Sequence, residues 1–195
     1  IITYLGHGNP TVLAHESMFL ISRDLSAIKN GGRLPFFYTA ASQVGVFDDP
    51  VRISMPEALL KKTNGGVIGM ISATRVGFHN SNIVLANQFH EQMYRSERQH
   101  VPVGLALMEA KQLVLPLFNS TDLAFRNMQR YSLFGDPATR LAVPLFQVQL
   151  SVDDSLNALG EVAVTGQVLD PAGVPVTDYQ GQVWLQAFDS SEKSR

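Results

Sequence analysis

A histidine and a serine, each at the end of an apolar segment, are the residues of this chain that could act together in catalysis. His7 follows the apolar segment 1–5, and Ser42 follows the apolar segment 36–41. In an open parallel sheet, side chains just past the carboxyl ends of the strands line the ligand crevice. An imidazole base beside a hydroxyl group is the arrangement that covalent catalysis requires.

One strand–helix–strand crossover separates the two residues. We therefore expect His7 and Ser42 on neighbouring strands at the same edge of a sheet. The glycines that flank His7 allow the backbone to come close to a ligand. In that position the backbone N–H groups of Gly8 and Ser42 could stabilise a developing oxyanion.

Alternating strands and helices are expected to position this pair. Continuous apolar runs are typical of strands in a parallel sheet that is covered by helices on both faces. Ser22 is expected to cap a helix, and Ser54 with Glu57 forms a capping-box pattern at the start of another. In chain order we predict strands 1–5, 34–41 and 67–72 and helices 23–30, 55–62, 81–95, 103–114 and 119–131. This pattern predicts an α/β fold with a parallel sheet flanked by helices.

The sequence changes character near Pro144, where strict alternation of apolar and polar residues replaces helical spacing. The alternating segments lie at 146–152, 162–168 and 183–187. They predict a small antiparallel β-sandwich module, which so few strands would leave incomplete. We therefore expect two domains, 1–143 and 144–195.

Composition narrows the classes of function. The formal net charge of the 195 residues is -2, so there is no broad basic surface for nucleic acid. The chain has no cysteine, which excludes disulfides, thiolate metal sites and a cysteine nucleophile. No run approaches the length of a membrane-spanning helix. Because Ile1 already lies within a strand pattern, we expect the chain to be a fragment of a longer protein.

Five segments occur in a distinctive order: YLGHGNP, LPFFYTAASQVGVFDDP, SMPEALLKKTNGGVIGMISATR, GLALMEAK and YSLFGDPATRLAVP. In this order they resemble the caspase-like catalytic domain of the gingipain family of cysteine peptidases. Within that family, the tail VTGQVLDPAGVPVTDYQGQVWLQAFD is similar to the β domain of PorU-type sortases of the bacterial type IX secretion system.

The resemblance implies roles for three residues. His7 matches the catalytic histidine, Gly8 supplies one N–H of the oxyanion hole, and Ser42 takes the position of the nucleophilic cysteine. The acidic residue that orients the histidine in the family would precede Ile1. We expect no cofactor and assign no metal ligands, and metal content stays open.

The resemblance also implies partners and a location. Sortases of this type remove the C-terminal sorting domain of secreted proteins and pass the new carboxyl end to a lipopolysaccharide amine. The implied partners are these sorting domains and the other proteins of the attachment complex. The implied location is the bacterial cell surface at the outer membrane.

Serine in place of cysteine leaves three explanations open, because a hydroxyl is a far weaker acid than a thiol. They are an engineered Cys→Ser inactivation, a natural pseudo-enzyme and a working serine variant. A non-catalytic surface module that binds sorting domains or serves as a scaffold is the rival function. An adhesion fragment, in which the β module acts and the α/β half is a spacer, is a third alternative.

Other polar motifs have weaker functional readings. Thr74 and Arg75 follow the third strand and either line the substrate cleft or belong to an ordinary surface loop. Asp48-Asp49 is expected to be a polar turn rather than a calcium site, because only two carboxylates cluster there. His15-Glu16 has no partner at metal-ligand spacing, so no metal site is expected at this position.

Overall fold

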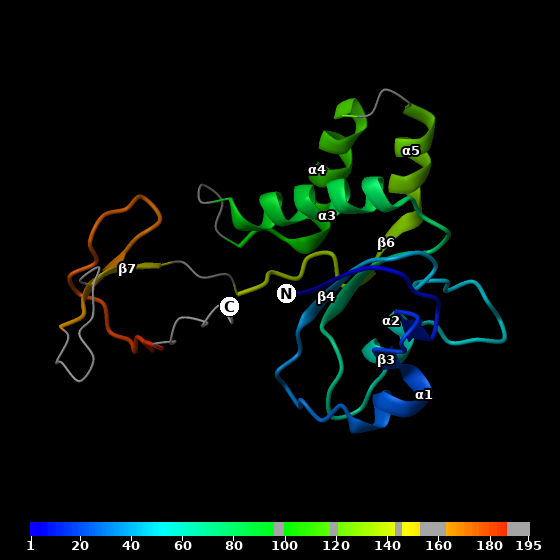
Figure 1. Cartoon of the computed structure of the whole chain (residues 1–195), viewed down its shortest axis with the longest axis horizontal. Helices are drawn as coiled ribbons and strands as arrows, with labels where there is room; N and C mark the ends of the chain where they lie inside the picture. Colours follow the sequence, from blue (N-terminus) through cyan, green and yellow to red (C-terminus); the bar gives the residue numbers. More distant parts are fainter. Residues whose placement is uncertain (96–99, 118–120, 143–145, 153–162, 187–195) are drawn as a thin grey trace, which may run out of the picture. The chain divides into compact units, whose positions relative to one another are not determined.

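The computed structural model describes residues 1–95, 100–117, 121–142, 146–152 and 163–186 (Figure 1). The chain divides into two compact units, Ile1–Val143 and Pro144–Arg195. The first unit carries both His7 and Ser42 and is described first.

A four-stranded sheet forms the centre of the first unit, with the strand order β1-β4-β5-β6. The strands are β1 (Ile2–Leu5), β4 (Phe36–Ala40), β5 (Gly69–Ala73) and β6 (Tyr131–Gly135). β1, β4 and β5 are parallel, as predicted, and β6 runs antiparallel to β5. The predicted α/β fold with helices on both faces of a sheet is thus confirmed, and β6, a strand that was not predicted, makes the sheet mixed because it is antiparallel.

β6 was not predicted from the sequence, because this strand follows a helix directly. The predicted helix 119–131 ends one residue earlier than expected, at Arg130, and the strand begins at Tyr131 without a loop. Tyr131 and Leu133 pack on one face of the sheet, and Phe134 packs on the other. Five residues of such alternation are too few to stand out against the helical spacing that precedes them.

Five helices and one short hairpin surround the sheet within the described residues. The helices are α1 (Ile21–Asp24), α2 (Met55–Leu60), α3 (His79–Tyr94), α4 (Val103–Val114) and α5 (Thr121–Arg130), with 3₁₀ turns at Leu25–Ala27 and Leu115–Leu117. The hairpin pairs β2 (Val12–Leu13) with β3 (Phe19–Leu20) in antiparallel fashion. α3, α4 and α5 lie on one side of the sheet, and α1, α2 and β3 lie on the other (Figure 1).

Alternation along β4 builds a separate core on each face. Phe36, Tyr38 and Ala40 pack with α3 and α4 in the larger apolar cluster. Phe37 and Ala41 join the smaller cluster with α2 and the β2–β3 hairpin. β4 is thus apolar on both faces because helices cover both, as its sequence predicted.

The helix starts illustrate one correct and one wrong prediction. Ser54 opens α2 as expected: its backbone N–H and its hydroxyl both donate to the Glu57 carboxylate, at 2.9 and 2.7 Å. Ser22 is not a cap, because α1 begins one residue before it, at Ile21. The Asp24 carboxylate accepts from the backbone N–H of Leu20 at 2.8 Å and so reaches back to the start of the helix.

Two glycine-containing turns are joined at the amino ends of β4 and β5. The Asn30 side chain accepts from the backbone N–H of Gly66 at 2.8 Å and donates to the Gly66 carbonyl at 3.0 Å. Gly66 has φ +104, and a Cβ there would lie 2.1 Å from the carbonyl oxygen of Leu59, so only glycine fits. This Asn30–Gly66 clamp lies at the opposite end of the strands from His7 and Ser42.

The second unit contains an antiparallel pair, β7 (Gln147–Ser151) and β8 (Thr165–Leu169). A turn follows β8, in which the Asp170 carboxylate accepts from the backbone N–H groups of Ala172 and Val174. Of the predicted strand 183–187, residues 183–186 are described and do not form a strand. Residue 187 and part of the segment 162–168 lie outside the described residues.

Candidate active site

The parallel register of β1 and β4 brings His7 and Ser42 to the same edge of the sheet. Leu5 is paired with Ala40. The next backbone N–H, that of Gly6, donates to the Ala40 carbonyl at 3.4 Å. His7 and Ser42 each lie two residues beyond the Leu5–Ala40 pair. The two residues therefore follow neighbouring strands at their carboxyl ends, as the sequence predicted.

Gly8 packs directly against the chain that leads into and out of position 42. A Cβ at Gly8 would lie 2.6 Å from a Val44 methyl carbon and 3.3 Å from the Ala41 Cβ. Real Cβ atoms do not approach that closely, so the absence of a side chain permits this contact. The backbone on the His7 side thus lies against the residues that flank Ser42.

Ser42 is partly buried, and its hydroxyl is bonded to one residue of the loop after β5. Its Oγ accepts from the Gly77 backbone N–H at 3.0 Å and donates to the Gly77 carbonyl at 3.4 Å. The next backbone N–H, that of Gln43, donates to the Arg75 carbonyl at 3.2 Å. Both the side chain and the backbone at position 42 are therefore tied to the loop 74–78.

A buried asparagine pair supports this loop from behind. The Asn127 side-chain oxygen accepts from the Phe78 backbone N–H at 3.2 Å, and its amide nitrogen donates to the Asn82 side-chain oxygen at 3.1 Å. Both asparagines are buried. The Arg130 guanidinium adds to the support, since it donates to the Val76 carbonyl and lies 5.5 Å from the centre of the Phe78 ring.

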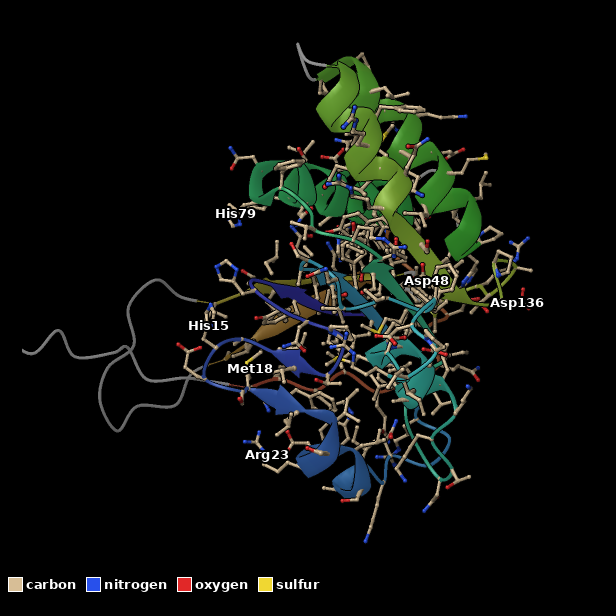
Figure 2. The ribbon with its side chains drawn as sticks, turned by 90° about the vertical axis from the view of Figure 1, so that its right-hand side faces the viewer. His15, Met18, Arg23, Asp48, His79 and Asp136 are labelled. Atoms are coloured by element: carbon tan, nitrogen blue, oxygen red, sulfur yellow. The ribbon has the colours of Figure 1, made fainter. Side chains whose placement is uncertain are left out.

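His7 is exposed and is held mainly through its backbone. The His7 carbonyl accepts from the Tyr4 hydroxyl at 2.8 Å and from the Ala14 backbone N–H at 2.9 Å. Its ring centre lies 5.3 Å from that of His15. The His15 side chain is also exposed (Figure 2). Within the described part of the chain, no hydrogen bond joins the His7 ring to Ser42. In free enzymes catalytic hydrogen bonds are often long and tighten only when substrate binds.

The proximity of His15 to His7 is the feature of this edge that was not predicted from the sequence. It lies in the loop between β2 and β3, and hairpin closure returns it to His7 through the Gly8–Leu13 bridge. Two strands of two residues each give no recognisable periodicity, so the sequence carries no signal for this proximity.

Thr74 and Arg75 lie near the site, but other groups occupy their polar atoms. The Thr74 hydroxyl is nearly buried and donates to the Arg130 carbonyl at 3.0 Å. Arg75 forms a two-pronged ion pair with Asp48, and these hydrogen bonds lower the pKa of the Asp48 carboxyl. Asp49 binds the Arg52 guanidinium and two backbone N–H groups. In Figure 2, Asp48 lies well away from His15.

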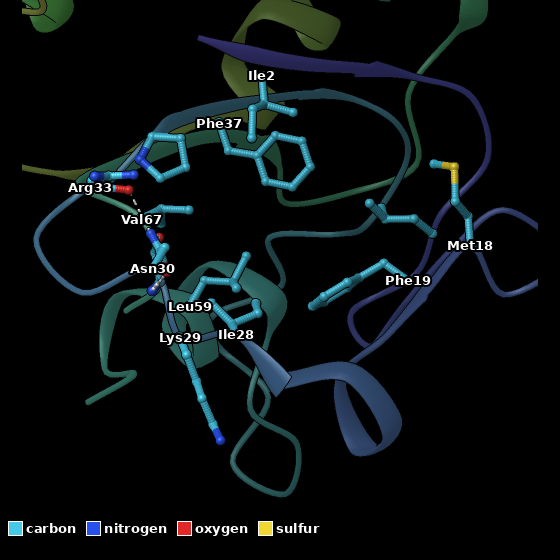
Figure 3. A pocket seen from close by; sticks show the side chains of 13 residues that line it. Ile2, Met18, Phe19, Ile28, Lys29, Asn30, Arg33, Phe37, Leu59 and Val67 are labelled. Carbon is cyan, nitrogen blue, oxygen red and sulfur yellow. Dashed lines mark hydrogen bonds between the residues drawn. The ribbon is translucent and has the colours of Figure 1, made fainter. Parts of the chain in front are cut away.

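A separate apolar pocket of about 530 Å³ lies on the α1–α2 side of the sheet (Figure 3). Ile2, Phe19, Phe37 and Leu59 are among the side chains that line it, and the Lys29 ammonium points away from it. Neither His7 nor Ser42 is among the lining residues. This pocket is therefore distinct from the strand-end site.

The described residues contain no cluster of three or more histidine, aspartate or glutamate side chains arranged to hold a metal ion. None of their helices has the length and apolar character needed to span a bilayer.

Comparison with known protein families gives a match over residues 1–142 to the model described as Peptidase family C25. The chain belongs to this family. The gingipain-like cysteine protease fold, expected from the ordered motifs, is thereby confirmed. Comparison with curated protein sequences gives no match.

Solved structures show the same C25 fold. The Arg-specific cysteine proteinase gingipain R (RgpB) is similar, with a TM-score of 0.63 and 17% identity over 90% of this chain and 44% of that one. The complex of the Porphyromonas gingivalis RgpB pro- and mature domains is similar with a TM-score of 0.62 and 18% identity, over 85% of this chain and 40% of that one. The chain thus spans less than half the length of these structures.

Proposed function

We propose that this chain is part of a PorU-like sortase of the type IX secretion system, and that it carries the histidine and the nucleophile position. The observation that carries the proposal is the β1–β4 register. It places His7 and Ser42 each two residues beyond the paired residues Leu5 and Ala40. Membership of family C25 supports peptide-bond chemistry at this edge. The similarity of the tail to the β domain of these sortases favours this branch of the family.

The proposed reaction is acyl transfer at the junction between a secreted protein and its C-terminal sorting domain. The side chain at position 42 attacks the junction carbonyl carbon and loses its proton to His7. His7 then gives that proton to the amine of the departing sorting domain. The Gly8 N–H group stabilises the oxyanion between these steps. A lipopolysaccharide amine then attacks the acyl carbon, and its proton passes through His7 to the side chain of position 42, which leaves as the bond to the acyl group breaks. We place the protein at the outer-membrane surface with the other attachment proteins as partners.

Binding of sorting domains without turnover is the second candidate, and one observation favours it for the sequence with serine. The Ser42 hydroxyl bonds to the Gly77 backbone, and no hydrogen bond from it to the His7 ring is found among the described residues. An alkoxide forms far less readily than a thiolate and needs a base in contact with it. In this alternative the C25 fold is retained and holds the peptide uncleaved.

The test compares Ser42→Cys with the unchanged sequence in the full-length protein. We expect a thiol-directed warhead on a sorting-domain peptide to label the Ser42→Cys protein in a reaction that His7→Ala slows by about 10²-fold or more. Binding of the same peptide without cleavage by the serine form would establish the second candidate. If neither form binds or reacts, both functions are rejected.

A further inference from the structure

Two imidazoles lie together at the strand-end site, and the proposed reaction uses that of His7 but not that of His15. The ring centres of His7 and His15 are 5.3 Å apart, and the ring planes are inclined by 48°. Both side chains are exposed, and neither ring makes a hydrogen bond to the rest of the described chain. Their ring nitrogens are therefore free to bind a solute.

The spacing of the rings suits a shared metal ion. A zinc ion binds imidazole nitrogen at about 2.0–2.1 Å in tetrahedral geometry, which places two ligating ring centres roughly 5 Å apart. The observed separation of 5.3 Å is close to this value, so only rotation of the two side chains is needed to direct both rings at one ion. Imidazole is a preferred ligand of Zn²⁺, Cu²⁺ and Ni²⁺ and a poor one for Ca²⁺ or Mg²⁺.

The backbone holds His15 beside His7 at a conformational cost. Ala14 has φ 63, in the left-handed region, and its N–H donates to the His7 carbonyl. A left-handed alanine costs about 1–2 kcal/mol relative to the usual conformation. Ser17, also left-handed, donates its backbone N–H to the Ala14 carbonyl, and its own carbonyl accepts from the Arg23 guanidinium. This strained turn directs His15 back toward His7.

We propose that His7 and His15 form a two-imidazole site for a divalent transition-metal ion, with Zn²⁺ as the representative ion. The remaining coordination positions are open to water or to a carboxylate of a bound peptide. This binding does not depend on the sortase function. If that function holds, the ion occupies the ring-nitrogen lone pair with which His7 accepts a proton. Metal binding then inhibits the acyl transfer.

The test is calorimetric titration of the full-length protein with Zn²⁺ in a non-chelating buffer. We expect His15→Ala and His7→Ala each to weaken binding at one site by about tenfold or more, since loss of even an outer-shell partner costs this much. His79→Ala is the matched control, because His79 is also exposed and should leave this site unchanged.

Chemical protection provides a second readout that other zinc sites do not obscure. Diethyl pyrocarbonate modifies free imidazoles, and mass spectrometry reports each histidine separately. Zn²⁺ should protect His7 and His15 together and leave His79 reactive. Equal modification of His7 and His15 with and without Zn²⁺, or unchanged Zn²⁺ affinity in His15→Ala, would overturn the proposal.

Discussion

The two sides of the strand-end site are built differently. Ser42 follows β4, an inner strand whose Tyr38 and Ala40 side chains are at most 3% exposed. His7 follows β1, an edge strand whose Ile2 and Leu5 side chains are about half exposed. Ser42 is bonded to the loop 74–78, whereas His7 is bonded through its carbonyl to Tyr4 and to the hairpin.

The difference in surroundings suggests that position 42 is rigid and that the His7 ring can change its contacts. Position 42, the proposed nucleophile position, is held by the buried core, so its backbone geometry should tolerate little adjustment. The His7 imidazole lies on a surface turn, and in our proposals its ring changes partners between water, a peptide and a metal ion. The following predictions test whether the two sides respond as differently as their surroundings indicate.

The largest contrast is expected from matched isoleucine truncations in the two strands. Ile71→Ala empties a fully buried position in β5, next to β4, and should lower the free energy of unfolding by about 2–5 kcal/mol. Ile2→Ala removes a half-exposed side chain from β1 and should cost less than about 1 kcal/mol. Denaturant unfolding of the two variants measures both values. Equal losses would contradict the distinction between an inner and an edge strand.

A smaller contrast is expected from two asparagines, one on each side. Asn127→Ala leaves the buried Asn82 side chain unpaired and removes the partner of the part-buried Phe78 N–H, and it should cost about 1–3 kcal/mol. Asn9→Ala removes hydrogen bonds to the backbone of Thr11 and Val12, which water replaces, and should cost only about 0.5 kcal/mol.

Thermal unfolding compares the stability of the two asparagine variants. In the Ser42→Cys background, Asn127→Ala should also slow warhead labelling, because Phe78 and Gly77 belong to one loop. A labelling rate that stays unchanged despite lowered stability would show that this loop does not position residue 42.

The smallest effect is expected from the exposed Arg75–Asp48 pair, and it depends on pH. Hydrogen bonds from Arg75 hold the pKa of Asp48 below its usual 3.8. The unfolded chain therefore takes up this proton more readily than the folded chain. The stabilisation is complete above that usual value and is lost as the pH falls through the lowered pKa of the folded state.

The measurement is the melting temperature of wild type and Asp48→Asn across this range. A small difference at neutral pH should shrink toward zero in acid and also shrink with added salt. Arg75→Gln should reproduce the behaviour of Asp48→Asn, and the double variant should add nothing further. A difference that grows in acid would show that the ion pair does not cause the effect.

The inner strands could be predicted because their sequences are continuous apolar runs with a helix cover on each face. The position of His7 and Ser42 at one edge followed from the crossover between them. The Ser54 capping box was equally visible, because local hydrogen bonds alone determine it. Each of these features depends on residues close together in the chain or on a general rule of parallel sheets.

Features that depend on contacts without a recognisable sequence pattern were not predictable. β6 pairs with a strand far before it in the chain, and His15 reaches His7 only when a very short hairpin closes. The bonding of Ser42 to Gly77 depends on where the loop after β5 lies. No local pattern in the sequence specifies any of these three contacts.

The Asn30–Gly66 clamp has a consequence for how such a protein can evolve. Hydrogen bonds between Asn30 and Gly66 join β4 and β5 at the end that takes no part in the proposed chemistry. Only glycine fits at position 66. A substitution at position 42, at the opposite end of the strands, leaves these hydrogen bonds in place. Related proteins could therefore differ at position 42, and differ in whether they cleave peptide, while keeping the same fold.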